Sequence, residues 1–240
     1  MSLRSTRIVI VGGTSGIGFA VAEGALKEQA RVVVASSNPA KVDAAVKRLP
    51  DGASGVTFDV TSESAIEAAF AQLGKFDHLV FTAGDWKARR GPLAELDLEA
   101  ARWNFAVRFW GALAVVKHAQ KSIAPGGSIT LTDGMVAHRP SKGSAVATAM
   151  AGAVEHLTRG LAVDLAPIRV NAVCPGLIRT EVWDSIPEDR RAEQFERMTK
   201  RQPLPRVGEP GEAAEAYLYL MRGGYTTGQV LHVDGGLSVI

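Results

Sequence analysis

Short apolar runs alternate with longer amphipathic segments along nearly all of this 240-residue chain. The short runs are almost continuously apolar, as expected for strands that are covered on both faces. Repeated strand–helix units predict a doubly wound parallel α/β sheet of about seven strands, with helices on both faces. Strands are expected at 7–11, 31–36, 55–59, 78–82, 128–132, 169–174 and 229–233, and helices at 16–28, 39–48, 62–73, 97–122, 144–165, 187–200 and 209–221.

Length and composition limit the classes of protein to which the chain can belong. The chain has 46% hydrophobic residues and a net charge of +2, which is typical of one globular domain over residues 1–240 and gives no reason to expect a nucleic-acid partner. The one cysteine, Cys174, excludes an intramolecular disulfide and a zinc cluster of several thiolates, and we predict no metal site. There is no signal-like leader and no run of about 20 apolar residues, so we expect a cytoplasmic protein without a membrane partner.

A glycine-rich turn follows the first predicted strand and precedes the first predicted helix. Its sequence is Gly12-Gly13-Thr14-Ser15-Gly16-Ile17-Gly18. Glycines permit tight turning and close approach to a pyrophosphate, and the helix N-terminus offers unpaired N–H groups. At this place in a βα unit, the turn predicts a dinucleotide site formed by Gly12, Thr14, Ser15, Gly16, Ile17 and Gly18.

The end of the second predicted strand distinguishes between the two nicotinamide cofactors. An acidic residue there would accept a hydrogen bond from the ribose 2′-hydroxyl and repel a 2′-phosphate. This chain instead has Ser36, Ser37 and Asn38, with Lys41 three residues further on. The absence of a carboxylate favours NADP(H) over NAD(H). Asp59 is expected near the adenine amine, or alternatively as a cap for the next helix.

These motifs resemble those of the short-chain dehydrogenase/reductase family over essentially the whole chain. Besides the glycine turn, Asp59-Val60-Thr61 resembles the adenine-contacting segment of the family, and Phe81-Thr82-Ala83-Gly84 corresponds to its Asn-Asn-Ala-Gly. The segments 169–176 and 233–236 are similar to its C-terminal signatures. The resemblance implies a bound dinucleotide contacted by Asp59, Val60, Ala83, Gly84, Pro175, Gly176, Ile178 and Thr180.

The resemblance fails at the catalytic residues. Family enzymes carry a Ser, a Tyr and a Lys that polarise the carbonyl and transfer a proton, and here those positions are occupied by Gly134, Ala147 and Ala151. The only tyrosines are Tyr217, Tyr219 and Tyr225, and no lysine occurs between Lys142 and Lys200. Asn104 is the one catalytic position that matches, so the usual proton relay is absent.

Three alternatives remain open for the chemistry. His138 or Asp133, which flank Gly134, would replace the missing acid, with His138 favoured by its intrinsic pKa. The substrate would otherwise be an iminium, which accepts hydride without a proton, in a pocket formed by Asp133, Gly134 and Ala147, with Trp86 or Trp183 stacking on it. In the third alternative the protein is a catalytically silent dinucleotide-binding sensor or assembly subunit. The leading prediction is an atypical NADP(H)-dependent oxidoreductase that acts on a small carbonyl or imine.

The helix expected at 144–165 is rich in small residues, including Ala145, Ala149 and Gly152. Small side chains allow another helix to approach closely. In the family that it resembles, the matching helix commonly packs against its own copy. We therefore expect a homodimer or homotetramer assembled through this helix.

Overall fold

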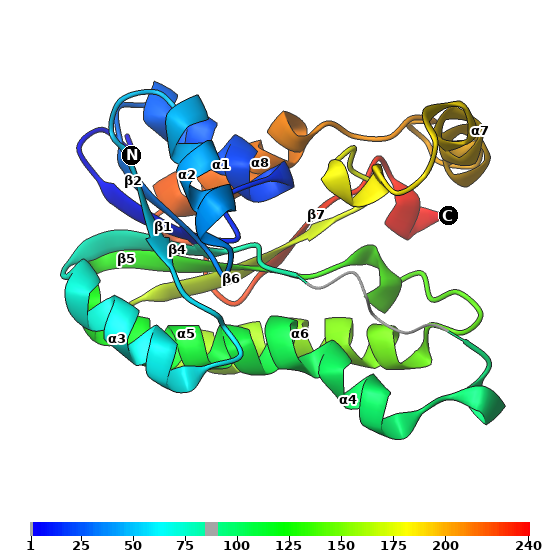
Figure 1. The fold of residues 1–240 in the computed structure, drawn as a ribbon, viewed down its shortest axis with the longest axis horizontal. Helices are drawn as coiled ribbons and strands as arrows, with labels where there is room; N and C mark the ends of the chain where they lie inside the picture. Colours follow the sequence, from blue (N-terminus) through cyan, green and yellow to red (C-terminus); the bar gives the residue numbers. More distant parts are fainter. Residues whose placement is uncertain (1, 85–90) are drawn as a thin grey trace.

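Seven parallel strands form one sheet at the centre of the computed structural model, which describes residues 2–84 and 91–240 (Figure 1). The strand order is β3-β2-β1-β4-β5-β6-β7, so the chain proceeds outward from β1 in both directions. This is the doubly wound parallel α/β architecture that the sequence predicts. The strands are β1 (Arg7–Val11), β2 (Arg31–Ser36), β3 (Ala53–Thr57), β4 (Phe76–Phe81), β5 (Ile123–Thr132), β6 (Arg169–Pro175) and β7 (Val230–Val233).

Helices cover both faces of the sheet (Figure 1). One layer contains α1 (Gly16–Lys27), α2 (Pro39–Arg48) and α8 (Pro210–Arg222). The opposite layer contains α3 (Glu63–Leu73), α4 (Leu98–Phe105), α5 (Ala112–Ala119) and α6 (Ala145–Asp164). A further helix, α7 (Glu188–Thr199), lies at the end of the molecule where the chain terminates.

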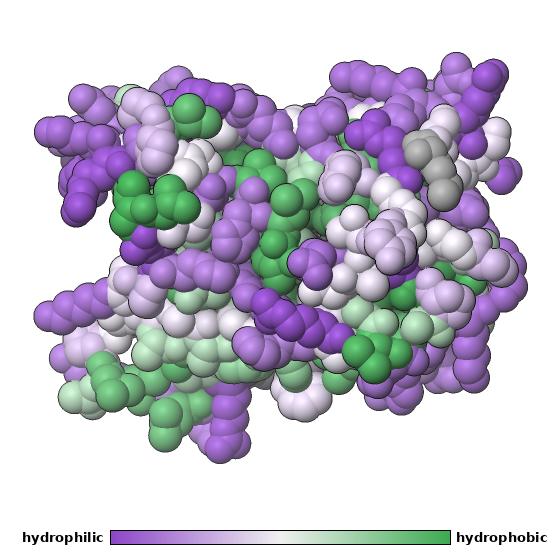
Figure 2. Space-filling model, turned by 180° about the vertical axis from the view of Figure 1, so that it is seen from behind, coloured by the Kyte–Doolittle hydropathy of each residue, from purple (hydrophilic) through white to green (hydrophobic). Residues whose placement is uncertain are grey.

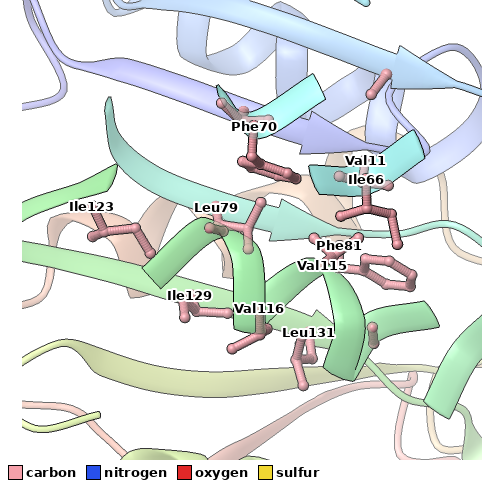
Figure 3. Packing of buried hydrophobic residues seen from close by; sticks show 14 of the residues in the cluster. Val11, Ile66, Phe70, Leu79, Phe81, Val115, Val116, Ile123, Ile129 and Leu131 are labelled. Carbon is pink, nitrogen blue, oxygen red and sulfur yellow. The ribbon is translucent and has the colours of Figure 1, made fainter. Parts of the chain in front are cut away.

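The two layers bury separate apolar cores. Val115 and Val116 of α5 point toward Ile129 and Leu131 of β5 in the larger core (Figure 3), and all four side chains are at most 1% exposed. On the other face, α1 packs against α8, which in turn contacts β5, β6 and β7, and Tyr217 of α8 is fully buried in this core. Burial of this kind stabilises a fold by roughly 1.5–3 kcal/mol for each large apolar side chain. The cores hold the strand ends, and hence the site, in fixed positions.

The edge strand β3 begins and ends two residues earlier than the predicted strand at 55–59. Its pairing with β2 runs from Ala53 opposite Val32 to Thr57 opposite Ser36. None of the residues in β3 is fully buried, so the strand carries little of the apolar signal on which a boundary prediction depends. The helix that follows is well defined at its start: Ser62 caps α3, because its hydroxyl accepts a hydrogen bond from the backbone N–H of Ala65.

The segment predicted as one helix over 97–122 contains a change of helix type. Between α4 and α5 the chain forms a π-helical segment, η2 (Ala106–Gly111), and after α5 a short 3₁₀ turn, η3 (Gln120–Ser122). A π-helical segment accommodates an additional residue within a helix. A 3.6-residue apolar period does not reveal such a local change, and the prediction of a uniform helix was therefore wrong here.

The surface is mixed in character. Figure 2 shows separate apolar clusters among the hydrophilic residues on the face opposite to that of Figure 1. Among the described residues, no helix combines the length and the apolarity that crossing a bilayer requires.

Candidate functional site

The sequence-predicted site residues gather at the carboxyl ends of the central strands. Because β1 lies between β2 and β4, the chain reverses its direction of progress across the sheet at this point. In open α/β sheets a ligand binds in the crevice outside the strand ends at such a switch point. The glycine turn after β1 and the loops after β4, β5 and β6 all emerge at this edge.

The glycine turn is packed too tightly for larger residues. Gly12 has φ +90°, and a Cβ atom there would lie 2.4 Å from the backbone nitrogen of Ala83. A Cβ atom on Gly18 would lie 2.3 Å from the carbonyl oxygen of Gly12. The turn leads into α1 at Gly16, and the N-cap residue Ser15 makes no side-chain capping bond. The first N–H groups of α1 therefore lack a side-chain cap, and helix N-termini of this kind attract anions.

The end of β2 carries neutral polar side chains. The Oδ1 atom of Asn38 caps α2 by accepting a hydrogen bond from the backbone N–H of Lys41, at 3.1 Å. The hydroxyl oxygen of Ser36 accepts from the backbone N–H of Asn38, at 3.3 Å. Ser37, Asn38 and Lys41 are exposed. This strand end presents hydroxyl, amide and ammonium groups to solvent and no carboxylate.

Asp59 stabilises a turn after β3. Its Oδ1 atom accepts hydrogen bonds from the backbone N–H and from the hydroxyl of Thr61, both at 2.8 Å. The cap of α3 is Ser62 and not Asp59. The neighbouring residue, Val60, contacts the helix layer, since a Cβ atom on Gly111 would lie 3.0 Å from the carbonyl oxygen of Val60.

The loop after β6 reaches back to the glycine turn. Gly176 donates its backbone N–H to the carbonyl of Val233, which ties the start of this loop to β7. Ile178 is 7% exposed and bridges to Gly208. The methyl carbon of Thr180 would lie 3.1 Å from a Cβ atom on Gly16. Thr180 is thus brought against the turn, as expected for two parts of one binding site.

Gly134 follows β5, and Ala147 and Ala151 lie on α6. Ala147 is 5% exposed and Ala151 is 1% exposed, so both methyl groups are packed inside the molecule. A cavity of about 70 Å³ lies at the start of α6, lined by Gly91, Leu93, Leu96, Gly143, Ala145 and Val146. Among the described residues, the buried Nδ2 atom of Asn104 has no hydrogen-bond partner.

The structure adds Arg108, which the sequence analysis did not select. Its guanidinium group lies between two loop glycines: a Cβ atom on Gly84 would be 2.7 Å from Nη2, and one on Gly134 would be 3.7 Å from Nη1. Arg108 therefore occupies the space beside Gly134, the position that the sequence analysis aligns with the serine of the family. One signal was available, because Arg108 follows Asn104 by four residues, which places the two on the same face of a helix.

The Nε2 atom of His138 points toward the protein interior. This nitrogen lies 2.5 Å from Oε1 of Glu155 on α6, and the imidazole ring packs edge-on against His232 with centroids 4.4 Å apart. Glu155 is 6% exposed, and it too was missed by the sequence analysis. Its signal was a lone acidic residue on the sheet-facing side of an otherwise apolar helix.

Asp133 is a buried carboxyl group that lies against the side chains of Glu155 and Cys174. It is 2% exposed. Burial, with a smaller contribution from Glu155, raises the pKa of Asp133 to about 8. Burial likewise raises the pKa of the Cys174 thiol, and the nearby Asp133 carboxylate adds to this effect. For Glu155, burial opposes ionisation, but hydrogen bonds from Asp133 and His138 outweigh it and lower the pKa.

Trp86 and Trp183 are the two aromatic residues that we predict could stack on a substrate. Trp183 donates its indole N–H to the carbonyl of Ile178 and packs edge-on against Phe195 at 5.2 Å, so its polar atom and one ring edge are used within its own loop region. Trp86 lies outside the described residues.

Comparisons with known proteins agree with this geometry. A family profile described as enoyl-(acyl carrier protein) reductase matches residues 11–238. The short-chain dehydrogenase/reductase fsr5 of Gibberella fujikuroi is 35% identical over 252 residues, which cover 98% of this chain and 95% of fsr5.

Solved structures give the same result. A small-chain dehydrogenase in complex with NADPH is 35% identical, with a TM-score of 0.83 over 97% of this chain and 98% of the other. The MalC reductase/Diels-Alderase of Malbranchea aurantiaca is also 35% identical, with a TM-score of 0.90 over 98% of this chain and 96% of MalC. The chain therefore belongs to the short-chain dehydrogenase/reductase family of oxidoreductases.

Proposed function

We propose that this protein is an atypical NADP(H)-dependent oxidoreductase that transfers hydride to a small carbonyl or imine without a Tyr/Lys proton relay. The observation that carries the cofactor assignment is the close packing of Gly12 and Gly18, where any Cβ atom would meet backbone at 2.4 Å or less. Such packing leaves the backbone of the turn open to a pyrophosphate. The similarity to a dehydrogenase solved with NADPH supports the same cofactor class.

The cofactor would be held along the edge described above. Gly12, Thr14, Ser15, Gly16, Ile17 and Gly18 would hold the pyrophosphate, Asp59 and Val60 the adenine, Ala83 and Gly84 the ribose, and Pro175, Gly176, Ile178 and Thr180 the nicotinamide end. Ser36, Ser37 and Asn38 favour NADP(H), because hydroxyl and amide groups donate hydrogen bonds to a 2′-phosphate. Lys41, which is exposed in the first turn of α2, adds a positive charge nearby.

When bound, the nicotinamide supplies the hydride. The protein contributes position and charge. Arg108 beside Gly134 would donate hydrogen bonds to a substrate oxygen or nitrogen and stabilise the negative charge that develops there. A neutral carbonyl or imine suits this guanidinium better than a cationic iminium, which it would repel. Asn104, one helical turn before Arg108, would orient the substrate or a water molecule.

His138 is a candidate proton donor that is already engaged. Its Nε2 atom contacts Glu155, so this nitrogen would have to leave the carboxylate before donating to substrate. A general acid contributes about 10²–10⁴-fold to a rate. A protein that lacks a well-placed acid is expected to be slow with unactivated ketones and faster with imines, whose nitrogen takes a proton from water readily.

One observation favours a second candidate, a catalytically silent dinucleotide-binding subunit. Ala147 and Ala151 are packed in the interior, so neither position presents an ionisable group. Calorimetric titration with NADPH and NADH, followed by turnover assays with small ketones and cyclic imines, separates the candidates. Turnover supports the oxidoreductase, whereas stoichiometric NADPH binding without turnover of either class supports the silent subunit. If neither nucleotide binds, both candidates are wrong.

The assembly and location of the protein are also proposals. The outer face of α6 carries Ala145, Ala149, Gly152, His156 and Gly160, and extra atoms at either glycine would meet nothing within 4 Å. Trp103, Trp110 and Val163 on the same side of the sheet are 61–79% exposed. A homodimer or homotetramer through α6 would cover these residues. We propose a cytoplasmic location on the basis of the sequence alone.

A further inference from the structure

Four side chains with metal-binding atoms converge near the ends of β6 and β7. They are His138, Glu155, Cys174 and His232, and their potential ligand atoms all lie within 4.8 Å of one another. Cys174 and His232 are register partners on adjacent parallel strands. Glu155 comes from α6, which packs over this face of the sheet, and His138 follows the 3₁₀ turn η4 (Met135–Ala137). The fold thus brings together residues that are distant in sequence.

The donor types and their spacing suit a four-coordinate cation. Imidazole nitrogen, thiolate sulfur and carboxylate oxygen are the usual zinc ligands, at about 2.0–2.3 Å from the metal. Tetrahedral ligands at those bond lengths lie about 3.3–3.8 Å apart. The potential ligand atoms here lie within 4.8 Å of one another, and Nε2 of His138 is 2.5 Å from Oε1 of Glu155. A bound cation would therefore draw the outer atoms inward and separate this close pair through small side-chain rotations.

Asp133 places a further carboxyl group next to these four residues. This carboxyl group is 2% exposed and interacts with the side chains of both Glu155 and Cys174. The backbone N–H of Asp133 bonds to the carbonyl of Val173, which places Asp133 next to Cys174 across β5 and β6. Buried carboxylates are normally paired or bound to a cation.

One nearby cationic side chain offsets part of the negative charge of Glu155. Arg159 is 3.7 Å from Oε2 of Glu155, but its side chain is 49% exposed. His138 is partly exposed, so an ion has a path to the cluster from solvent, while Cys174 closes its buried side. The cluster is therefore open to solvent at His138 and closed on its buried side by Cys174.

We propose that His138, Glu155, Cys174 and His232 form a binding site for a divalent cation of the zinc type, with Asp133 as an adjacent carboxylate that stabilises the bound charge. On binding, the Cys174 S–H bond breaks, the sulfur–metal bond forms, and the proton passes to the solvent. The metal would join the segment after β5 to the ends of β6 and β7 beside the cofactor crevice. This inference does not depend on hydride transfer.

Cobalt titration of the tag-free full-length protein, after removal of bound metal with a chelator, tests the site. One equivalent of Co²⁺ should produce a thiolate-to-cobalt absorption band in the near ultraviolet together with visible d–d bands, and Zn²⁺ should abolish both. These spectra report metal ligation directly and are independent of nucleotide binding and turnover. A wild-type protein that binds no stoichiometric Co²⁺ or Zn²⁺ overturns the proposal.

Variants identify the ligands. Cys174→Ser should remove the near-ultraviolet band, and His232→Gln and His138→Gln should each weaken binding at least about tenfold. His118→Gln is the matched control, because His118 lies on α5 and is not a member of the cluster. Since Cys174 is buried, the partly exposed His138 provides the variant most certain to fold, and circular dichroism checks each one. Unchanged affinity in folded His138→Gln and His232→Gln would also overturn the assignment.

Discussion

The guanidinium group of Arg108 lies beside Gly134, where a Cβ atom would be 3.7 Å from Nη1. A cation thus lies next to the position that we propose to correspond to the catalytic serine of the family. If Arg108 stabilises charge in the transition state, Arg108→Met should lower kcat by about 10²–10³-fold while changing the Kd for NADPH little. Steady-state kinetics and calorimetry measure the two effects. Arg102→Met, at an exposed position of α4, is the control, and equal turnover in both variants would contradict the role.

The cofactor preference is expected to depend on Ser36. Ser36→Asp places a carboxylate at the end of β2, where it would repel a 2′-phosphate and accept a hydrogen bond from a ribose hydroxyl. We expect the Kd for NADPH to rise at least about tenfold, or about 1.4 kcal/mol, and the Kd for NADH to fall. Ser36→Asn is the neutral control of similar shape. A similar loss of NADPH affinity in both variants would show that charge is not the cause.

Restoration of the proton relay has two expected effects. Ala147→Tyr combined with Ala151→Lys should raise ketone reduction by about a hundredfold, the lower end of the range for a general acid. Because both alanines are buried, each substitution should also cost about 1–3 kcal/mol through overpacking. Thermal unfolding and NADPH oxidation measure these effects together. Ala147→Ser serves as a small-volume control, and a folded double variant without ketone turnover would count against the proposed cofactor geometry.

Acid should destabilise the fold in part through His78. Burial lowers the pKa of His78 to about 4, and its Nδ1 atom lies 2.9 Å from the hydroxyl oxygen of Ser128. Between pH 6.5 and pH 4, His78 is therefore neutral in the folded state but protonated in the unfolded chain. This contribution is fully present above pH 6.5 and is lost as the pH falls toward 4, by about 3 kcal/mol at most.

Denaturant unfolding at several pH values measures this effect. His78→Asn should lessen the loss of stability between pH 6.5 and pH 4 relative to the wild type. His156→Asn, which removes an exposed histidine, should leave the wild-type pH dependence unchanged. An identical pH dependence in wild type and His78→Asn would mean that the proton is taken up elsewhere.

A large side chain introduced on the outer face of α6 tests whether the protein assembles through this helix. Gly152→Arg adds a long side chain where no neighbouring atom lies within 4 Å, so the protomer should fold normally. We expect the homo-oligomer to dissociate, as measured by light scattering after size exclusion. Gly211→Arg, at an equally open position in α8, should not affect assembly. A monomeric wild type, or an oligomer that tolerates Gly152→Arg, would contradict the proposal.

The sequence predicts the fold well because the fold rests on repeated local patterns. The boundaries of β1, β2 and α2 coincide with the predicted ranges, since β-branched runs and a Pro at the helix start mark them clearly. The family resemblance and the parallel doubly wound sheet are confirmed. The bounds of β3 were wrong because an exposed edge strand has no continuous apolar run.

The candidate site was predictable only in part. Sequence motifs mark the glycine turn and the substituted catalytic positions, because each lies within a short contiguous segment. Arg108 and the His138–Glu155–Cys174–His232 cluster depend on contacts between elements far apart in the chain. No spacing rule predicts such contacts, so the expectation of no metal site followed from local sequence alone.

The π-helical segment between α4 and α5 allows side chains before and after it to point in directions that a regular α-helix would not combine. Each residue in an α-helix advances the direction of the side chain by about 100°. The additional residue in η2 sets the phase that lets Arg108 turn toward the strand ends while Val115 and Val116 still face the sheet. Deleting one residue between Arg108 and Gly111 would rotate the two halves against each other, so that either the pocket or the hydrophobic interior would lose its contribution from this helix.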